Sequence, residues 1–259
     1  MPEGDTVYRT AEHLNAVLAG RVLTGCDIRV PKFATVDLTG ETVHDVVSRG
    51  KHILMRVGEF SIHSHLKMEG TWHIYQPKTR WRKPAFKARA ILRTAEHTAV
   101  GFELGLLEVL NRADEGDAVD YLGPDLLGPD WDAGEAERRL ASDPLREIDV
   151  ALLDQRNLAG LGNVFVNELC FLRGVLPTRP VAEVPRLDAV VQLAHRLITA
   201  NRDRVERTTT GDTRPGKQVF VYNRAGQPCR RCGNRIQSGK LGANALSLRD
   251  TYWCPYCQT

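Results

Sequence analysis

A chain of 259 residues is long enough to bury a sizeable core and suits one large domain or two smaller ones. Its 42% hydrophobic content is ordinary for a globular protein, and it contains no run of about 18 apolar residues, which excludes a membrane-spanning helix. The first residues lack the basic-then-apolar pattern of a secretion signal, so we expect a cytoplasmic protein; the net charge of +3 excludes little by itself.

The first predicted element is a helix over Thr6–Ala19. Apolar residues recur along it at close to helical spacing, so one face should pack against a core. These residues are Val7, Ala11, Leu14 and Leu18. Asp5 is expected to cap the N-terminus of the helix, and Gly20 is expected to end it.

A β-rich region follows from Arg21 to Val109. Short β-branched runs, interrupted by turns at Gly50, Gly58 and Gly70, favour an antiparallel sandwich or barrel. The runs are RVLTGCDIRV (21–30), HDVVSRG (44–50), KHILMRV (51–57), FSIHSHL (60–66), TWHIY (71–75), ARAILRT (88–94) and TAVGF (98–102).

The rest of the chain is predicted to be mainly helical. A stretch rich in Asp, Gly and Pro over 111–144 indicates a linker with one short helix at 133–141, and further helices are expected at 147–155, 163–172 and 185–206. We therefore expect an α+β protein in four segments. These are an N-terminal helix and β-sandwich domain (1–112), a linker (113–145), a helical domain (146–215) and a C-terminal hairpin (216–259).

Charge is distributed unevenly along the chain. Residues 49–93 contain 11 Lys and Arg against two Glu, and residues 201–259 contain 11 against four acids. Residues 114–154 between them contain 13 acids against three Arg. Two basic blocks around an acidic one indicate two faces that bind a polyanion, although a charged surface that merely varies is the alternative.

Six cysteines in a cytoplasmic chain argue against a disulfide framework, and Cys26 and Cys170 lie in apolar contexts typical of reduced core residues. The other four form two CxxC pairs separated by 21 residues, a spacing that can close one tetrahedral thiolate site for Zn²⁺. Four thiolates leave no open coordination position, so this zinc should be structural. The ligands are Cys229, Cys232, Cys254 and Cys257.

The predicted zinc hairpin is itself basic, since it carries Arg230, Arg231, Arg235, Lys240 and Arg249. The alternative is a hairpin that only stabilises the end of the chain or binds another protein. The basic residues favour nucleic acid as its partner.

The opening MPEGDTVYRTAEHL resembles the start of the formamidopyrimidine-DNA glycosylase and endonuclease VIII family of DNA repair enzymes. Four further stretches match that family in the same order, so the resemblance covers essentially the whole chain. They are SRGKHIL (48–54), HSHLKMEGTW (63–72), LLDQRNLAGLGNVFVNELCFLRGVLP (152–177) and VYNRAGQPCRRCG with YWCPYCQ (221–258). The PEG start and the WCPYCQT ending are similar to the endonuclease VIII branch.

The resemblance implies that Pro2 is the nucleophile once Met1 is removed. A terminal amine titrates near ~7.7–8.0, well below a lysine side chain, so more of it is nucleophilic at neutral pH. Attack of this secondary amine on the sugar C1′ gives an iminium, which acts as an electron sink for elimination. Glu3 matches the carboxylate that protonates the sugar ring oxygen, with capping of the first helical turn as its alternative role. Lys51 matches a hairpin lysine that assists elimination; solvation alone is its alternative.

Five further residues are expected to contact DNA. Gly162 and Asn163 match the helix–two-turns–helix element, where backbone N–H groups and the Asn amide meet a phosphate; a plain helix hairpin is the alternative. Arg249 matches a hairpin arginine associated with δ-elimination, for which a clamp on phosphates is easier than proton donation. Lys67 and Met68 lie in the loop that fills the space of an everted nucleotide; burial of Met68 in the sheet is the alternative.

Three departures from the family pattern bear on specificity. Asp5-Thr6 replaces the usual Pro-Glu after PEG, the wedge loop lacks the usual Gln-Leu-Tyr order, and residues 103–107 contain no Arg-x-Phe pair for contacting the opposite cytosine. The last point argues against specialisation for 8-oxoguanine.

The expected function is a monomeric, nucleoid-associated DNA glycosylase and apurinic/apyrimidinic lyase acting on oxidised pyrimidines by β,δ-elimination. Its partner would be damaged double-stranded DNA, with single-stranded or bubble DNA left open, and binding should weaken steeply with salt. An 8-oxoguanine/formamidopyrimidine glycosylase and a non-catalytic damaged-DNA-binding zinc protein are the two alternatives.

Overall fold

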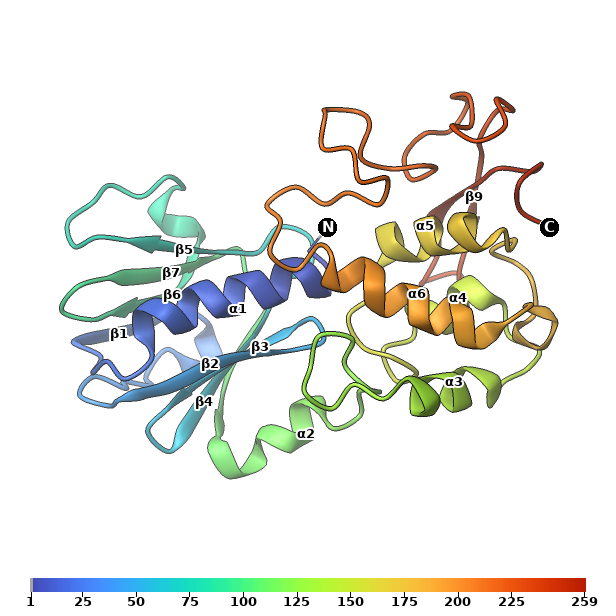
Figure 1. The fold of residues 1–259 in the computed structure, drawn as a ribbon. Helices are drawn as coiled ribbons and strands as arrows, with labels where there is room; N and C mark the ends of the chain where they lie inside the picture. The colour runs from blue at the N-terminus through green and yellow to red at the C-terminus, as the bar shows by residue number, and fades with distance from the viewer. Residues whose placement is uncertain (1) are drawn as a thin grey trace. The chain divides into compact units, whose positions relative to one another are not determined.

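The computed structural model describes residues 2–259, which divide into two compact units, one up to residue 121 and one over residues 122–259 (Figure 1). The first unit combines one long helix with two antiparallel sheets. The second contains short helices followed by a cysteine-bearing hairpin. The expected α+β class is confirmed.

The first helix, α1 (Gly4–Leu18), buries the apolar face that its spacing predicts, including Val7 and Leu14. It begins earlier than expected, and the assignment of Asp5 as its N-cap is wrong. Glu3 occupies that position with extended backbone angles (φ −120°, ψ −175°). Asp5 already has helical geometry and is buried in the first turn, so its backbone cannot serve as the non-helical cap.

Two four-stranded antiparallel sheets follow α1. The first has the order β1-β6-β7-β5 and the second has the order β2-β3-β4-β8. Their strands are β1 (Gly25–Ile28), β2 (Val43–Arg49), β3 (His52–Val57), β4 (Phe60–His65), β5 (Thr71–Tyr75), β6 (Ala88–Arg93), β7 (Thr98–Phe102) and β8 (Leu106–Asn111). β8 is an additional strand that the predicted runs did not include.

The main core of this unit lies between the two sheets and α1. It joins Leu14 of α1 with Ile53 and Ile62 of the second sheet and with Leu92 and Ala99 of the first. Of the two predicted alternatives, the sandwich is therefore the one observed. Burial of these side chains from three layers stabilises the unit by removing apolar surface from water.

Five further helices connect the sheets to the C-terminal hairpin. They are α2 (Glu115–Val119), α3 (Ala133–Ala141), α4 (Ile148–Leu153), α5 (Asn163–Arg173) and α6 (Leu187–Thr199). α2 was not predicted, because a single acidic turn has no apolar periodicity. The hairpin pairs β9 (Gln237–Leu241) with β10 (Arg249–Trp253). Short 3₁₀ turns occur at Pro31–Phe33, Ala85–Lys87, Arg112–Asp114 and Val181–Glu183.

The helices of the second unit enclose a separate apolar core around α5, to which Phe165 and Leu169 contribute. Cys170 is a buried free thiol in this core, as expected, whereas Cys26 in β1 is only partly buried. No helix within residues 2–259 has both the length and the apolar character needed to cross a membrane.

Asp149 is an unusual buried acid at the start of α4. Burial, and then the nearby Glu147, raise the pKa of Asp149 to about 7, while the backbone N–H of Val150 donates to its Oδ1 at 2.7 Å. A carboxyl whose folded pKa exceeds its unfolded pKa binds more protons when folded. Its contribution to stability is therefore complete below the unfolded pKa of 3.8 and is lost as the pH rises through about 7.

Replacing Asp149 with Asn should consequently stabilise the protein at alkaline pH. We expect Asp149→Asn to raise the melting temperature at pH 8 by several degrees, equivalent to about 1–3 kcal/mol, because it removes a buried charge and keeps the Oδ1 acceptor. The gain should shrink towards pH 4. Calorimetry at both pH values checks this, with Asp117→Asn as a control that removes an exposed carboxylate. An equal gain at both pH values would contradict the assignment.

Candidate active site and metal centre

Pro2 and Glu3 lie immediately before the first turn of α1. Pro2 is partly exposed, whereas Glu3 is 0% exposed and holds the N-cap position, where its backbone carbonyl accepts from Val7 N at 3.0 Å. Glu3 therefore caps α1 through its backbone, which is one of the two roles that the sequence left open, and the catalytic role of its buried carboxyl remains a prediction. Met1 lies outside the described residues, so the expectation that it is removed remains a prediction.

Lys51 lies in a tight turn between β2 and β3. Arg49 pairs with His52 across the ladder, so Gly50 and Lys51 alone form the turn, and Gly50 has the positive φ (58°) that such a turn requires. A lysine at the tip of a two-residue turn is held by strands on both sides. The turn predicted at Gly50 is therefore present.

A chain of polar side chains crosses the second sheet beside this turn. Nδ1 of His52 lies 2.7 Å from Nε2 of His63, whose Nδ1 lies 2.8 Å from Oε1 of Glu108. Nε2 of His52 lies 3.1 Å from the Tyr121 hydroxyl. When Nδ1 of each ring carries its proton, His52 donates to His63, His63 donates to Glu108, and the hydroxyl of Tyr121 donates to His52.

The histidines nearest Lys51 are held neutral. Burial and then the neighbouring His63 and His65 lower the pKa of His52 to about 3. Burial and then Lys67 and Lys51 lower the pKa of His65 to about 4. At neutral pH His52 and His65 are therefore uncharged beside Lys51 and Lys67. These histidines had no predicted role, although the alternation of His63 and His65 in FSIHSHL was the available signal.

The loop between β4 and β5 presents Met68, whose side chain is 61% exposed. The loop is closed by Gly70, whose N–H donates to the Leu66 carbonyl at 2.9 Å, and Lys67 adopts a positive φ of 53°. The Lys67 side chain lies against Gly105, where a Cβ would come within 2.2 Å of Lys67 Cγ. Met68 is thus not buried in the sheet, the alternative that the sequence left open.

In the second unit, the start of α5 is tied to the C-terminal hairpin. Gly162 is the N-cap of α5, and Asn163, which is 6% exposed, donates from Nδ2 to the Asp250 carbonyl of β10 at 2.8 Å. Asn167, one turn later, accepts from the backbone N–H of Tyr252. The side-chain amide of Asn163, which was expected to bind a phosphate, therefore holds the hairpin in this structure.

Arg249 is the exposed first residue of β10, adjacent to the residue that Asn163 holds. With Arg146, Asp154 and Ser247 it lines a hollow of about 160 Å³. The structure therefore brings Asn163 and Arg249, which are far apart in the sequence, to one region. The first unit contains the other predicted site residues, which are Pro2, Glu3, Lys51, Lys67 and Met68.

The four predicted cysteine ligands converge. Their Sγ atoms all lie within 4.8 Å of one another, with Cys229–Cys257 at 4.0 Å and Cys232–Cys254 at 3.4 Å. These S–S separations are longer than the S–S bond of a disulfide. One is slightly shorter and one slightly longer than the separation of about 3.8 Å between two sulfurs of a tetrahedral site with Zn–S bonds of about 2.3 Å. Arg231 N and Asn234 Nδ2 donate to two of the sulfurs, which suits thiolates. The cluster fits a four-coordinate metal ion.

Glu168 is a structural residue for which the sequence predicted no role. Its fully buried carboxylate accepts from Phe220 N, Val221 N and Tyr222 N at 2.7–2.8 Å and from the hydroxyl of Thr209. An acid in the otherwise apolar stretch NVFVNELCFLRG was the available signal, because a buried carboxylate needs several donors. It anchors the segment between α6 and the cysteine cluster.

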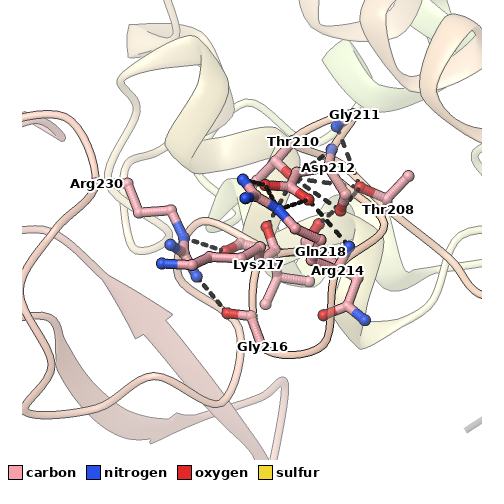
Figure 2. A network of polar contacts seen from close by, with 10 residues as sticks. Thr208, Thr210, Gly211, Asp212, Arg214, Gly216, Lys217, Gln218 and Arg230 are labelled. Carbon is pink, nitrogen blue, oxygen red and sulfur yellow. Dashed lines mark hydrogen bonds and ion pairs between the residues drawn. The ribbon is translucent and has the colours of Figure 1, made fainter.

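Within that segment, residues 208–218 form a closed loop (Figure 2). The hydroxyl of Thr208 accepts from Gly211 N at 3.1 Å, and Thr209 N donates to the Gln218 carbonyl at 2.8 Å, which joins the two ends. Arg214 forms a two-nitrogen ion pair with Asp212, and Arg230 donates to the Val219 and Gly216 carbonyls. These hydrogen bonds and this ion pair together hold the loop in one conformation.

Comparison with known proteins places this geometry in a family. The model of the formamidopyrimidine-DNA glycosylase N-terminal domain matches residues 1–105, and the model of the H2TH domain of the same enzymes matches residues 122–211. Among solved structures, the complex of the Lactococcus lactis Fpg with DNA containing an abasic site has a TM-score of 0.81 at 22% identity, covering 100% of both chains. MutM in complex with DNA containing carbocyclic 8-oxo-G has a TM-score of 0.82 at 22% identity, also over both full chains. These two likenesses establish the fold.

Curated relatives match over the full length. The chain is 55% identical to "DNA-(apurinic or apyrimidinic site) lyase Nei2" of Mycolicibacterium smegmatis, covering 100% of this chain and 99% of the relative. It is 52% identical to "Endonuclease 8 2" of Mycobacterium tuberculosis, covering 100% of both, and 31% identical to "Endonuclease 8" of Escherichia coli, also covering 100% of both. The resemblance that the sequence motifs suggested is confirmed, and the chain belongs to the formamidopyrimidine-DNA glycosylase family.

Proposed function

We propose that this protein is a bifunctional DNA glycosylase and apurinic/apyrimidinic lyase of base excision repair that removes oxidised pyrimidines. One observation carries the proposal. Pro2 and the buried Glu3 lie directly before α1, in a chain that is similar over its full length to a protein named an apurinic or apyrimidinic site lyase.

In the proposed mechanism the Pro2 nitrogen attacks C1′ of the damaged nucleotide as the bond to the base breaks. Glu3 protonates the ring oxygen of the sugar, which opens the ring and leaves an iminium on C1′. Loss of a proton from C2′ sends electrons into that iminium and breaks the C3′–O bond, with Lys51 assisting. A second elimination breaks the C5′–O bond, and Arg249 stabilises the departing phosphate by charge-assisted hydrogen bonds.

The remaining residues hold the DNA. Lys67 and the exposed Met68 occupy the space that the everted nucleotide leaves, and Gly162 with Asn163 contacts a phosphate from the start of α5. Residues 1–112 carry the catalytic residues. After a linker at 113–145, the helical segment 146–215 and the hairpin 216–259 also bind DNA. The cysteine cluster binds one structural Zn²⁺, which supplies rigidity to the hairpin.

The link between β7 and β8 supports a pyrimidine substrate. It consists of Glu103–Gly105 alone, and the Glu103 carboxylate is paired with Lys83 at 2.9 Å and with Lys87 at 2.7 Å. So short and tethered a link offers no Arg-x-Phe pair to contact an opposite cytosine. The protein acts as a cytoplasmic, nucleoid-associated monomer on damaged duplex DNA, and single-stranded or bubble DNA is the further substrate to compare.

A lesion panel tests the proposal. Duplexes carrying thymine glycol, 8-oxoguanine or an abasic site are incubated with the wild-type chain and with Glu3→Gln. We expect base release and strand cutting at thymine glycol to exceed those at 8-oxoguanine, and Glu3→Gln to lose base release by about 10²-fold or more. Preference for 8-oxoguanine would favour the purine-specific alternative. Binding to all three duplexes without cutting would favour a non-catalytic DNA-binding protein.

A further inference from the structure

A cavity of about 580 Å³ lies in the first unit, outside the residues assigned to catalysis. Its walls come from the middle of α1, from β5 and from the loop that follows β5. Arg9 and His13 belong to the first wall, since residues four apart share one face of a helix. Pro2, Glu3, Lys51 and Met68 do not line it.

The cavity concentrates positive charge, and its lining contains no acidic side chain. None of its twelve lining residues is acidic, and Arg9, Arg80 and Arg82 form no ion pair within residues 2–259. Other bases of the same block are matched by acids, as in the pairs Arg56–Glu115 (2.6 Å) and Lys87–Glu103 (2.7 Å). Three neighbouring guanidinium groups without counter-ions favour an anionic ligand.

The loop that carries two of these arginines is pinned to the sheet. The Tyr75 hydroxyl accepts from Arg82 N at 3.1 Å and lies 2.9 Å from Nδ1 of His73. The Trp81 ring stacks on Tyr75 and meets Phe102 edge-on, with centroids 6.4 Å and 5.8 Å apart. The cavity wall is therefore formed before any ligand binds, which lowers the cost of ordering on binding.

The cavity floor also offers neutral polar groups. β5 is the terminal strand of its sheet, so its outer edge presents backbone N–H groups, and concavities of this kind bind anions. Burial, and then Lys83 and Arg82, lower the pKa of His73, so at neutral pH its ring carries one donor and one acceptor nitrogen. Trp72 and Gln76 complete this part of the lining.

We propose that this cavity binds a nucleotide, with the arginines on its phosphates and the β5 residues around its sugar and base. Its volume falls within the range of about 300–1,000 Å³ that is usual for small-molecule sites. The same chemistry occurs in a free nucleoside diphosphate and in a 5′-phosphorylated end of single-stranded DNA. The inference goes beyond the proposed function, because binding here involves no glycosylase or lyase step.

Calorimetric titration of the full-length protein tests the site. The probes are thymidine diphosphate, inorganic pyrophosphate and a short 5′-phosphorylated oligothymidylate. The double variant Arg80→Ala/Arg82→Ala removes two of the three guanidinium groups from exposed positions, so it should fold. Arg89→Ala is the matched control, because it removes an exposed charge from the same basic block and does not line the cavity.

We expect a nucleotide probe to bind the wild-type protein more tightly than pyrophosphate does. The double variant should weaken that binding by at least about tenfold and Arg89→Ala by less than about twofold. Tighter binding of the diphosphate identifies a free nucleotide as the ligand, and tighter binding of the oligothymidylate identifies a strand end. The proposal is overturned if neither nucleotide probe binds, if pyrophosphate binds as tightly, or if both variants lose affinity equally. None of these results depends on whether the protein cleaves DNA.

Discussion

Sodium borohydride is expected to cross-link the protein to abasic-site DNA only when Pro2 is the first residue. In the chain beginning at Pro2, the secondary amine forms an iminium with C1′, and reduction makes this bond permanent. A Gly-Ser extension ahead of Pro2 turns the amine into an amide, which is not nucleophilic. We expect trapping and strand cleavage to fall by at least about 10³-fold in the extended chain. Gel analysis of the covalent complex measures the loss.

The extension can be made removable, which supplies the control. Proteolysis that restores Pro2 as the first residue should restore trapping in the same preparation, and intact mass confirms each form. Glu3→Gln should still be trapped on a preformed abasic site to a larger extent than the extended chain, since its nucleophile is intact. Equal trapping with and without the extension would show that another amine, such as that of Lys51, forms the Schiff base.

The second large effect concerns the metal. We expect one Zn²⁺ per chain, and we expect Cys257→Ser to lose the metal together with at least about 10²-fold in DNA affinity. β9 and β10 bury little side-chain surface, and most residues of β9 are exposed. The hairpin therefore depends on the cysteine cluster for its stability. Loss of the hairpin also removes the Asp250 carbonyl that Asn163 holds, which releases the start of α5.

Elemental analysis, circular dichroism and DNA titration check the three parts of this prediction. Cys26→Ser is the matched control, because it removes a partly buried thiol outside the cluster. It should retain the metal and the affinity for DNA. The first unit should stay folded in Cys257→Ser, since its core is built from residues of that unit. Full DNA affinity in a metal-free variant would remove the structural role of the zinc.

Features set by short sequence spacing were predicted well. α5 begins at Asn163 and α3 spans Ala133–Ala141 as expected, because apolar periodicity and caps are local properties of the chain. The two CxxC pairs identified the four cysteines that converge for the same reason. The prediction of Asp5 as the N-cap failed, because the choice between Glu3 and Asp5 depends on how the chain enters the core rather than on residue preference.

Long-range pairings could not be predicted in this way. The chain from His52 through His63 to Glu108 depends on the register of β3, β4 and β8, and β8 itself was not predicted. The role of Glu168 depends on backbone N–H groups more than 50 residues away. Such contacts exist only after distant segments have packed together.

By itself, the sequence determined the family, the α+β class, the four cysteines and the Pro2-Glu3 start, because each is encoded in residues that lie close together along the chain. Only the tertiary structure decided that Glu3 is buried, that Met68 is exposed, that Asn163 holds the hairpin, and that three arginines line one cavity whose lining contains no acid. The physical reason is that burial and ion pairing depend on which distant segments meet, and local spacing does not contain that information.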